Sequence, residues 1–377
     1  MSKSKKLTLS MLPTPTPVLD HHGQTLFGPM KEWSTQNRIP PVLLLTGASG
    51  VGKRSIAYFI SQWVMCETSS PAKPSASSQD LFSAMATITH KSSREFSIPC
   101  GKCRSCQNAV AGSWVDFMEI LPEGDDPSDP LKIERFRKLK ESLGFSAHEG
   151  TYRIVLIPNA EQMTPQAANS VLKILEEPPP GWIFLLTTSD PTLLLPTLVS
   201  RCQFLRLKPF PSKTLKEILL TSGVAPARAE VCARLAEGSW GKALALASDE
   251  AWEKRNTVFS FIENPESQMN AIVDWAAADE IHLTQLIDQL ESIVSDLIKW
   301  STSAESASFY SWNHSDGKAA LNRHVESAIK KLGGVAQARE FWINRADRLG
   351  AARRQIRIPL NRKLLVQDLL LPWVGSR

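Results

Sequence analysis

A glycine-rich turn that ends in lysine is the first feature of this sequence able to do chemistry. The turn reads Gly-Ala-Ser-Gly-Val-Gly-Lys from Gly47 to Lys53, after an apolar run of strand length and before a helical pattern. In that setting, backbone N–H groups surround phosphate oxygens, the helix N-terminus favours negative charge, and the lysine reaches the β and γ phosphates. We predict a phosphate loop for ATP or ADP; a turn that holds no nucleotide is the alternative. Its expected members are Gly47, Ser49, Gly50, Val51, Gly52, Lys53, Arg54 and Ser55.

The position after the lysine lacks the usual magnesium ligand. P-loop NTPases place Ser or Thr there, and its hydroxyl holds Mg²⁺. This sequence has Arg54, which cannot ligate a cation, while Ser55 comes one residue late and would point elsewhere on the helix. We therefore expect nucleotide binding at this loop to be possible without metal-assisted hydrolysis.

The acids that should complete such a site are missing as well. A P-loop NTPase carries Asp, often followed by Glu, at the end of a later apolar strand, where they support Mg²⁺ and the attacking water. The matching strand here, Tyr152–Ile157, runs into Pro158 and Asn159. Glu161 lies two residues beyond the asparagine, and we interpret it as an exposed residue near a helix start. Two separate losses argue against hydrolysis by this chain.

A cluster of cysteines indicates a metal site. Cys100, Cys103 and Cys106 are spaced so that three thiolates can converge on one tetrahedral ion, at Zn–S distances of about 2.3 Å. A closed structural site needs a fourth ligand; Cys66 is the candidate and His90 the runner-up. Four ligands leave no open position, so we predict structural rather than catalytic zinc. A reduced cluster without metal is the alternative.

The elements that must position these residues follow an α/β pattern in the first part of the chain. Apolar runs of strand length alternate with amphipathic helical patterns, which predicts a parallel five-stranded sheet with helices on both faces. After about Pro209 the pattern is helical only. We expect an α/β domain at 1–208 with the cysteine module at about 66–106, then helical domains at 209–250 and 251–377. The stretch 69–95, rich in Ser, Ala, Pro and Thr, is interpreted as an insertion.

Composition excludes some classes of protein. Lysine and arginine exceed aspartate and glutamate by five, a mild excess that does not by itself indicate nucleic acid. No apolar stretch reaches the roughly 18–20 residues that span a bilayer. The basic N-terminus is not followed by an apolar run and a cleavage site, so we expect no signal peptide and a cytoplasmic protein.

Three further segments carry a family resemblance. Residues 168–179 read Ala-Asn-Ser-Val-Leu-Lys-Ile-Leu-Glu-Glu-Pro-Pro, residues 183–191 read Ile-Phe-Leu-Leu-Thr-Thr-Ser-Asp-Pro, and residues 198–202 read Leu-Val-Ser-Arg-Cys. Together with the phosphate loop they resemble, in order and spacing from about residue 27 to 245, the bacterial clamp-loader subunits of the AAA+ class. The C-terminal third matches only as helical and of suitable length.

The positions at which the sequence differs from that family's pattern are all ones that the ATP-hydrolysing subunits need. The hydrolysing tau/gamma type keeps Thr after the loop lysine, the Asp-Glu pair, and an Arg in the helical lid as second sensor. Here Gly241 stands in place of that Arg, with Lys242 beside it. The chain therefore resembles the non-hydrolysing type of subunit.

The resemblance implies fold, partners and one catalytic residue. The fold would be an AAA+ P-loop domain with a zinc module, a helical lid and a C-terminal collar that assembles into a hetero-oligomer. Arg201 would act in trans on the ATP of a neighbouring subunit; a surface arginine in an ordinary salt bridge is the alternative. The implied partners are the tau/gamma and delta subunits, with the sliding clamp and primer–template DNA reached through the complex. Rival interpretations are a divergent tau/gamma-like ATPase using Asn159 or Glu161, and an unrelated P-loop protein with a zinc knob.

Overall fold

The computed structural model describes residues 16–36, 38–68, 96–123, 129–143, 147, 152–302, 314, 316–356 and 361–374. The predicted insertion at 69–95, and His90 within it, lie outside these residues. The chain divides into two compact units, Met1–Phe210 and Pro211–Arg377. A further boundary near residue 250 stays a prediction.

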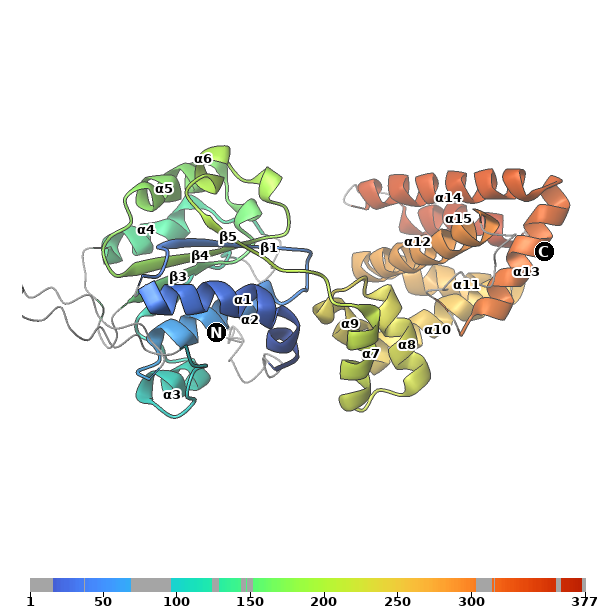
Figure 1. Cartoon of the computed structure of the whole chain (residues 1–377). Helices are drawn as coiled ribbons and strands as arrows, with labels where there is room; N and C mark the ends of the chain where they lie inside the picture. Colours follow the sequence, from blue (N-terminus) through green and yellow to red (C-terminus); the bar gives the residue numbers. More distant parts are fainter. Residues whose placement is uncertain are drawn as a thin grey trace, which may run out of the picture. The chain divides into compact units, whose positions relative to one another are not determined.

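The first unit is built on the parallel five-stranded sheet that the sequence predicts (Figure 1). The order of its strands is β2-β3-β4-β1-β5. Every residue of the two central strands β1 and β4 is buried, because helices cover both faces of the sheet. The edge strand β2 has three residues and is shorter than the apolar run 116–121 from which the sequence predicts it. The strands are β1 (Val42–Thr46), β2 (Phe117–Glu119), β3 (Arg153–Ile157), β4 (Trp182–Thr188) and β5 (Gln203–Arg206).

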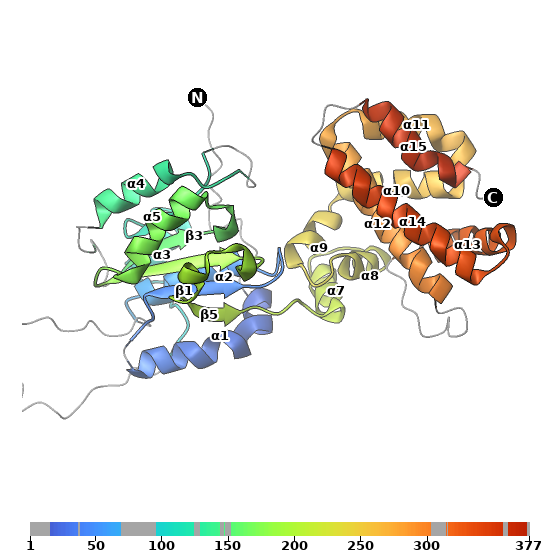
Figure 2. The ribbon, with the colours of Figure 1, turned by 90° about the horizontal axis from the view of Figure 1, so that it is seen from above.

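Helices lie on both sides of this sheet, α4, α5 and α6 on one face and α1 and α2 on the other (Figures 1 and 2). Helix α5 begins at a Thr-Pro pair typical of a helix start: Pro165 takes the first position, and the Thr164 side chain accepts from the Ala167 N–H. The helices of this unit are α1 (Thr16–Gln36), α2 (Lys53–Met65), α3 (Arg104–Ala111), α4 (Ile133–Ser142), α5 (Pro165–Glu176) and α6 (Pro196–Val199).

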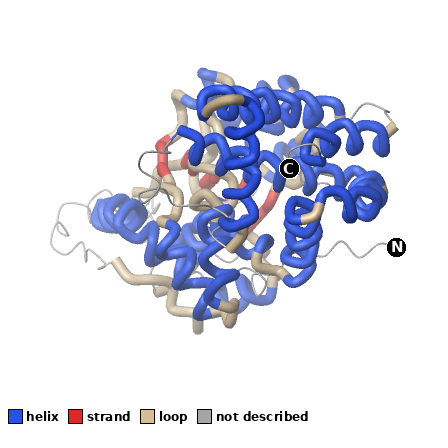
Figure 3. Tube along the Cα trace, turned by 90° about the vertical axis from the view of Figure 1, so that its right-hand side faces the viewer, coloured by secondary structure: helices blue, strands red, loops and turns tan. Residues whose placement is uncertain are grey.

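The described part of the second unit is entirely helical, as predicted for the chain after Pro209 (Figure 3). One apolar core joins α10 to α15, and Trp342 and Trp373 are its largest side chains. None of the described helices is long and apolar enough to cross a membrane. The helices are α7 (Ser212–Thr221), α8 (Pro226–Leu235), α9 (Trp240–Leu246), α10 (Asp249–Glu263), α11 (Pro265–Ala277), α12 (Glu280–Thr302), α13 (Lys318–Leu332), α14 (Val335–Gln355) and α15 (Arg362–Val374).

Candidate nucleotide and metal sites

The predicted phosphate loop connects β1 to α2, and two of its glycines are required by the backbone. Gly47 has φ +150°, and a Cβ there would lie 2.6 Å from the carbonyl oxygen of Leu207. Gly52, the N-cap of α2, has φ +95°, and a Cβ would lie 2.7 Å from Val18 of α1. Only glycine fits both the conformation and the space. The loop therefore has the strand–turn–helix geometry that the pattern predicts.

Lys53 is folded back into its own loop. Its ammonium group donates to the carbonyl oxygens of Gly47 (2.7 Å) and Ala48 (3.0 Å) and to Oγ of Ser189 (3.1 Å), the residue that follows β4. The side chain is 7% exposed, and this burial lowers the pKa of Lys53, with nearby Glu161 opposing the shift. The lysine is thus fully hydrogen-bonded before any phosphate arrives.

Arg54 points to the end of β2. Its Nε lies 2.7 Å from one carboxylate oxygen of Glu119, and its Nη2 donates to the other at 2.8 Å. The Tyr58 hydroxyl donates to the same carboxylate at 2.7 Å, and burial, followed by Glu119, raises the pKa of Tyr58 to about 12. This two-point pairing commits the guanidinium to Glu119, where it ties the start of α2 to the sheet edge.

The end of β3 carries no carboxylate. Pro158 and Asn159 follow the strand, and Asn159 has a left-handed backbone (φ +48°) with its N–H bonded to Oγ1 of Thr187. Glu161 lies in the short 3₁₀ helix Ala160–Gln162 that comes next. The expectation that Glu161 is simply exposed is wrong. It is half-buried, and its Oε1 accepts from the Ser189 N–H at 3.0 Å, because this 3₁₀ helix packs against β4.

Arg201 comes just after Ser200, the C-cap of α6, and is exposed. Its Nη2 lies 2.9 Å from Oε1 of Glu176, at the C-terminus of α5, and its Nη1 donates to the carbonyl oxygen of Thr197. The two side chains of this ion pair are 35% and 44% exposed. Pairs in such positions contribute about 0–1 kcal/mol, so the guanidinium can leave Glu176 at little cost.

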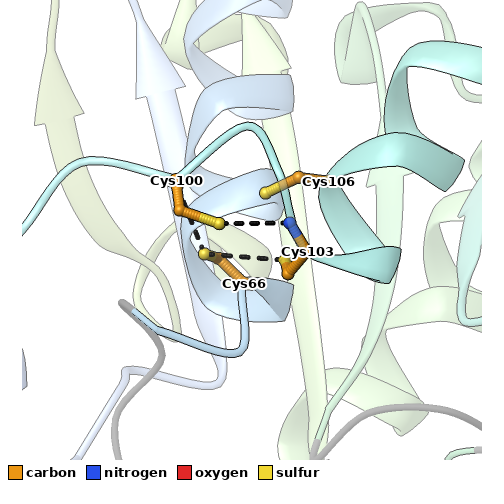
Figure 4. Close-up of side chains that lie close together, drawn as sticks. All are labelled: Cys66, Cys100, Cys103 and Cys106. Atoms are coloured by element: carbon orange, nitrogen blue, oxygen red, sulfur yellow. Dashed lines mark hydrogen bonds between the residues drawn. The ribbon is translucent and has the colours of Figure 1, made fainter.

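The four predicted cysteines come together (Figure 4). Their sulfur atoms all lie within 4.8 Å of one another. Cys66 is the C-cap of α2, Cys100 and Cys103 lie just before α3, and Cys106 lies in its first turn. Backbone N–H groups of Lys102 and Cys103 donate to the Cys100 sulfur, and these bonds lower the pKa of the Cys100 thiol. Sulfur atoms converging in this way could hold a structural metal ion such as zinc.

The sequence reasoning missed two partners in these sites. Glu119 binds Arg54 across 65 residues, and Ser189 binds Lys53 across 136 residues. The Ser189 contact follows from strand order, because β4 lies beside β1. The Glu119 contact follows from the packing of α2 against the edge strand β2, where Tyr58 also lies against Phe117. The local sequence pattern gives neither. A polar residue directly after an apolar strand was the available signal for Ser189.

Fold and sites together define an AAA+-like P-loop protein with a four-cysteine cluster and a helical C-terminal region. A family model described as DNA polymerase III, delta subunit, matches residues 75–211. DNA polymerase III subunit delta′ of Yersinia pestis is 27% identical over 339 residues, which are 88% of this chain and 88% of that protein. Subunit delta′ of Escherichia coli K12 is 32% identical over 57% of each chain. Over 88% of its length the chain is similar to subunit delta′ of DNA polymerase III, and over 57% of its length it is also similar to subunit tau of Escherichia coli K12.

Two solved structures of low sequence identity are also similar. A gamma subunit-related protein of DNA polymerase III from Thermotoga maritima has 18% identity and a TM-score of 0.44, covering 92% of this chain and 99% of its own. RuvB of the same organism, titled a Holliday junction branch migration motor, has 13% identity and a TM-score of 0.37, covering 78% of each chain.

Proposed function

We propose that this chain is a non-hydrolysing scaffold of a DNA polymerase III clamp loader and that it activates ATP hydrolysis in a neighbouring subunit. Its partners would be the tau/gamma and delta subunits, and it would reach the sliding clamp and primer–template DNA through the complex in the cytoplasm. Domains 1–208, 209–250 and 251–377 would serve as AAA+ domain, lid and oligomerising collar. The similarity to subunits delta′ and tau, both named as subunits of DNA polymerase III, supports this assembly.

The single observation that carries the proposal is a contrast between two arginines. Arg54 stands where a hydrolysing subunit needs a magnesium ligand and is held by Glu119 within the fold. Arg201 is exposed beyond α6, where it pairs with Glu176 at the surface and donates to the carbonyl oxygen of Thr197. The chain thus lacks the means to hydrolyse ATP itself and presents a guanidinium to the outside. A guanidinium placed on a neighbour's γ-phosphate stabilises the charge that develops during transfer.

The two cofactor sites would have different roles. Cys66, Cys100, Cys103 and Cys106 would hold one structural zinc ion, which would tie the segment before α3 to the end of α2. The loop around Lys53 would bind the phosphates of ATP or ADP through backbone N–H groups, without hydrolysis. The zinc site therefore supports the fold, and the loop supplies binding only.

The isolated chain tests the rival interpretation, a divergent tau/gamma-like ATPase. We expect purified chain to release phosphate from Mg-ATP no faster than the Lys53→Ala variant, because neither Asn159 nor Glu161 occupies the end of β3. The measurement is steady-state phosphate release at saturating ATP. Turnover that disappears on Lys53→Ala would favour the ATPase and contradict the scaffold.

A further inference from the structure

Beyond the missing magnesium ligands, the phosphate loop contains a second obstacle to nucleotide. Lys53, the residue that should receive the β and γ phosphates, already binds Gly47, Ala48 and Ser189. A phosphate must therefore draw the ammonium group away from three acceptors. The strength of these three hydrogen bonds therefore affects how tightly the loop can bind a phosphate group.

The residue that strengthens this hold is Glu161. Its Oε1 accepts from the Ser189 N–H at 3.0 Å, while the Ser189 hydroxyl accepts from Lys53 at 3.1 Å. Ser189 thus joins the carboxylate and the ammonium group through one residue. The carboxylate is close enough to stabilise the charged lysine directly.

The second carboxylate oxygen of Glu161 also depends on the position of Lys53. Oε2 of Glu161 is buried and has no hydrogen-bond partner among the described residues. A buried carboxylate oxygen without a donor is unfavourable unless a positive charge lies nearby. Lys53 supplies that charge, so Glu161 needs the lysine where it now lies. An entering phosphate would remove the lysine from Glu161 and add a second anion beside it.

We propose that Glu161 is a gating residue that weakens the binding of nucleoside di- and triphosphates to this loop by holding Lys53 through Ser189. This inference rests on the proposed function, since it concerns the same phosphate loop. On this proposal the loop glycines and Lys53 are still able to bind phosphate, and the Glu161 carboxylate lowers the affinity of the loop for nucleoside di- and triphosphates. Absence of magnesium ligands alone would not do this, because phosphate contacts from the loop need no metal.

The test is the affinity of the full-length chain for fluorescently labelled ADP, measured in buffer without added magnesium and without a chelator, so that magnesium plays no part and the cysteine cluster keeps its metal. Glu161→Gln keeps an oxygen for the Ser189 N–H but removes the charge, and we expect it to bind about ten-fold tighter than the unmodified chain. Glu177→Gln, an exposed acid after α5, is the matched control and should not change the affinity. Adding Lys53→Met to Glu161→Gln should abolish the gain.

Each outcome decides the proposal. Tighter binding by Glu161→Gln that requires Lys53 supports the gate. If Glu161→Gln and the unmodified chain bind ADP equally, or if neither binds measurably, the proposal is overturned. It is also overturned if the tighter binding of Glu161→Gln persists when Lys53→Met is added. Matched thermal unfolding midpoints exclude misfolding as the cause. The trans-activating role is separate: a complex containing Glu161→Gln should keep full ATP turnover, and loss of turnover there would count against the proposed function instead.

Discussion

Replacing Arg201 with alanine is expected to slow ATP hydrolysis at the neighbouring site of the assembled complex by about 10³-fold, the lower end of what a trans-acting arginine supplies. The physical reason is that a guanidinium stabilises charge which develops only in the transition state. Binding of ATP should change little, because the ground state carries less of that charge. The measurement is phosphate release by the complex in the presence of clamp and primed DNA.

Two matched variants separate this role from a general loss of structure. Arg206→Ala removes another exposed arginine from the neighbouring strand β5 and should leave turnover within about two-fold of normal. Glu176→Gln removes only the partner of the intrachain ion pair, which contributes at most about 1 kcal/mol, and should not slow turnover. Equal losses in Arg201→Ala and Arg206→Ala would mean that Arg201 has no special role.

Replacing Cys103 with serine is expected to remove the zinc ion and to destabilise the first unit by at least about 3 kcal/mol. The sulfur of Cys103 lies 3.9 Å from that of Cys66, so its loss opens a site that joins two distant segments. A neutral hydroxyl is a poor substitute for a thiolate ligand. The measurements are zinc content per chain and the denaturant midpoint of unfolding.

The matched control is Cys202→Ser, which changes a cysteine outside the cluster. The Cys202 thiol donates to the carbonyl oxygen of Leu198 at 3.2 Å, a bond that serine can keep, so zinc content should not change. Unmodified chain prepared under reducing conditions without chelator should hold about one zinc ion. Less than about half an ion per chain there, or unchanged stability in Cys103→Ser, would contradict the zinc assignment.

The sequence predicted the parts of this fold that local pattern controls. Each strand of the sheet and the start of α5 at Thr164 and Pro165 follow from apolar runs and capping residues. The cysteines could be grouped because their spacing is itself a geometric constraint. Clustering of their sulfur atoms confirms that grouping.

Contacts that depend on strand order could not be predicted. Nothing near Lys53 in the sequence indicates Ser189, because the sheet order brings β4 beside β1. Nothing near Arg54 indicates Glu119, because the two meet only where α2 packs against the edge strand β2. The exposure of Glu161 was predicted wrongly because its partner is also distant in the sequence. In the sequence it is one more polar residue in a turn, whereas in the fold its carboxylate accepts a hydrogen bond from the Ser189 N–H after β4.

The central claim is that this chain contributes to a neighbour's active site and has none of its own. The most direct measurement compares ATP turnover, with clamp and primed DNA, by complexes assembled with the Lys53→Ala chain and with the Arg201→Ala chain. The account predicts that Lys53→Ala, which disables the chain's own phosphate loop, leaves turnover within about two-fold of normal, while Arg201→Ala nearly abolishes hydrolysis at one site. Loss of turnover with Lys53→Ala and normal turnover with Arg201→Ala would contradict it.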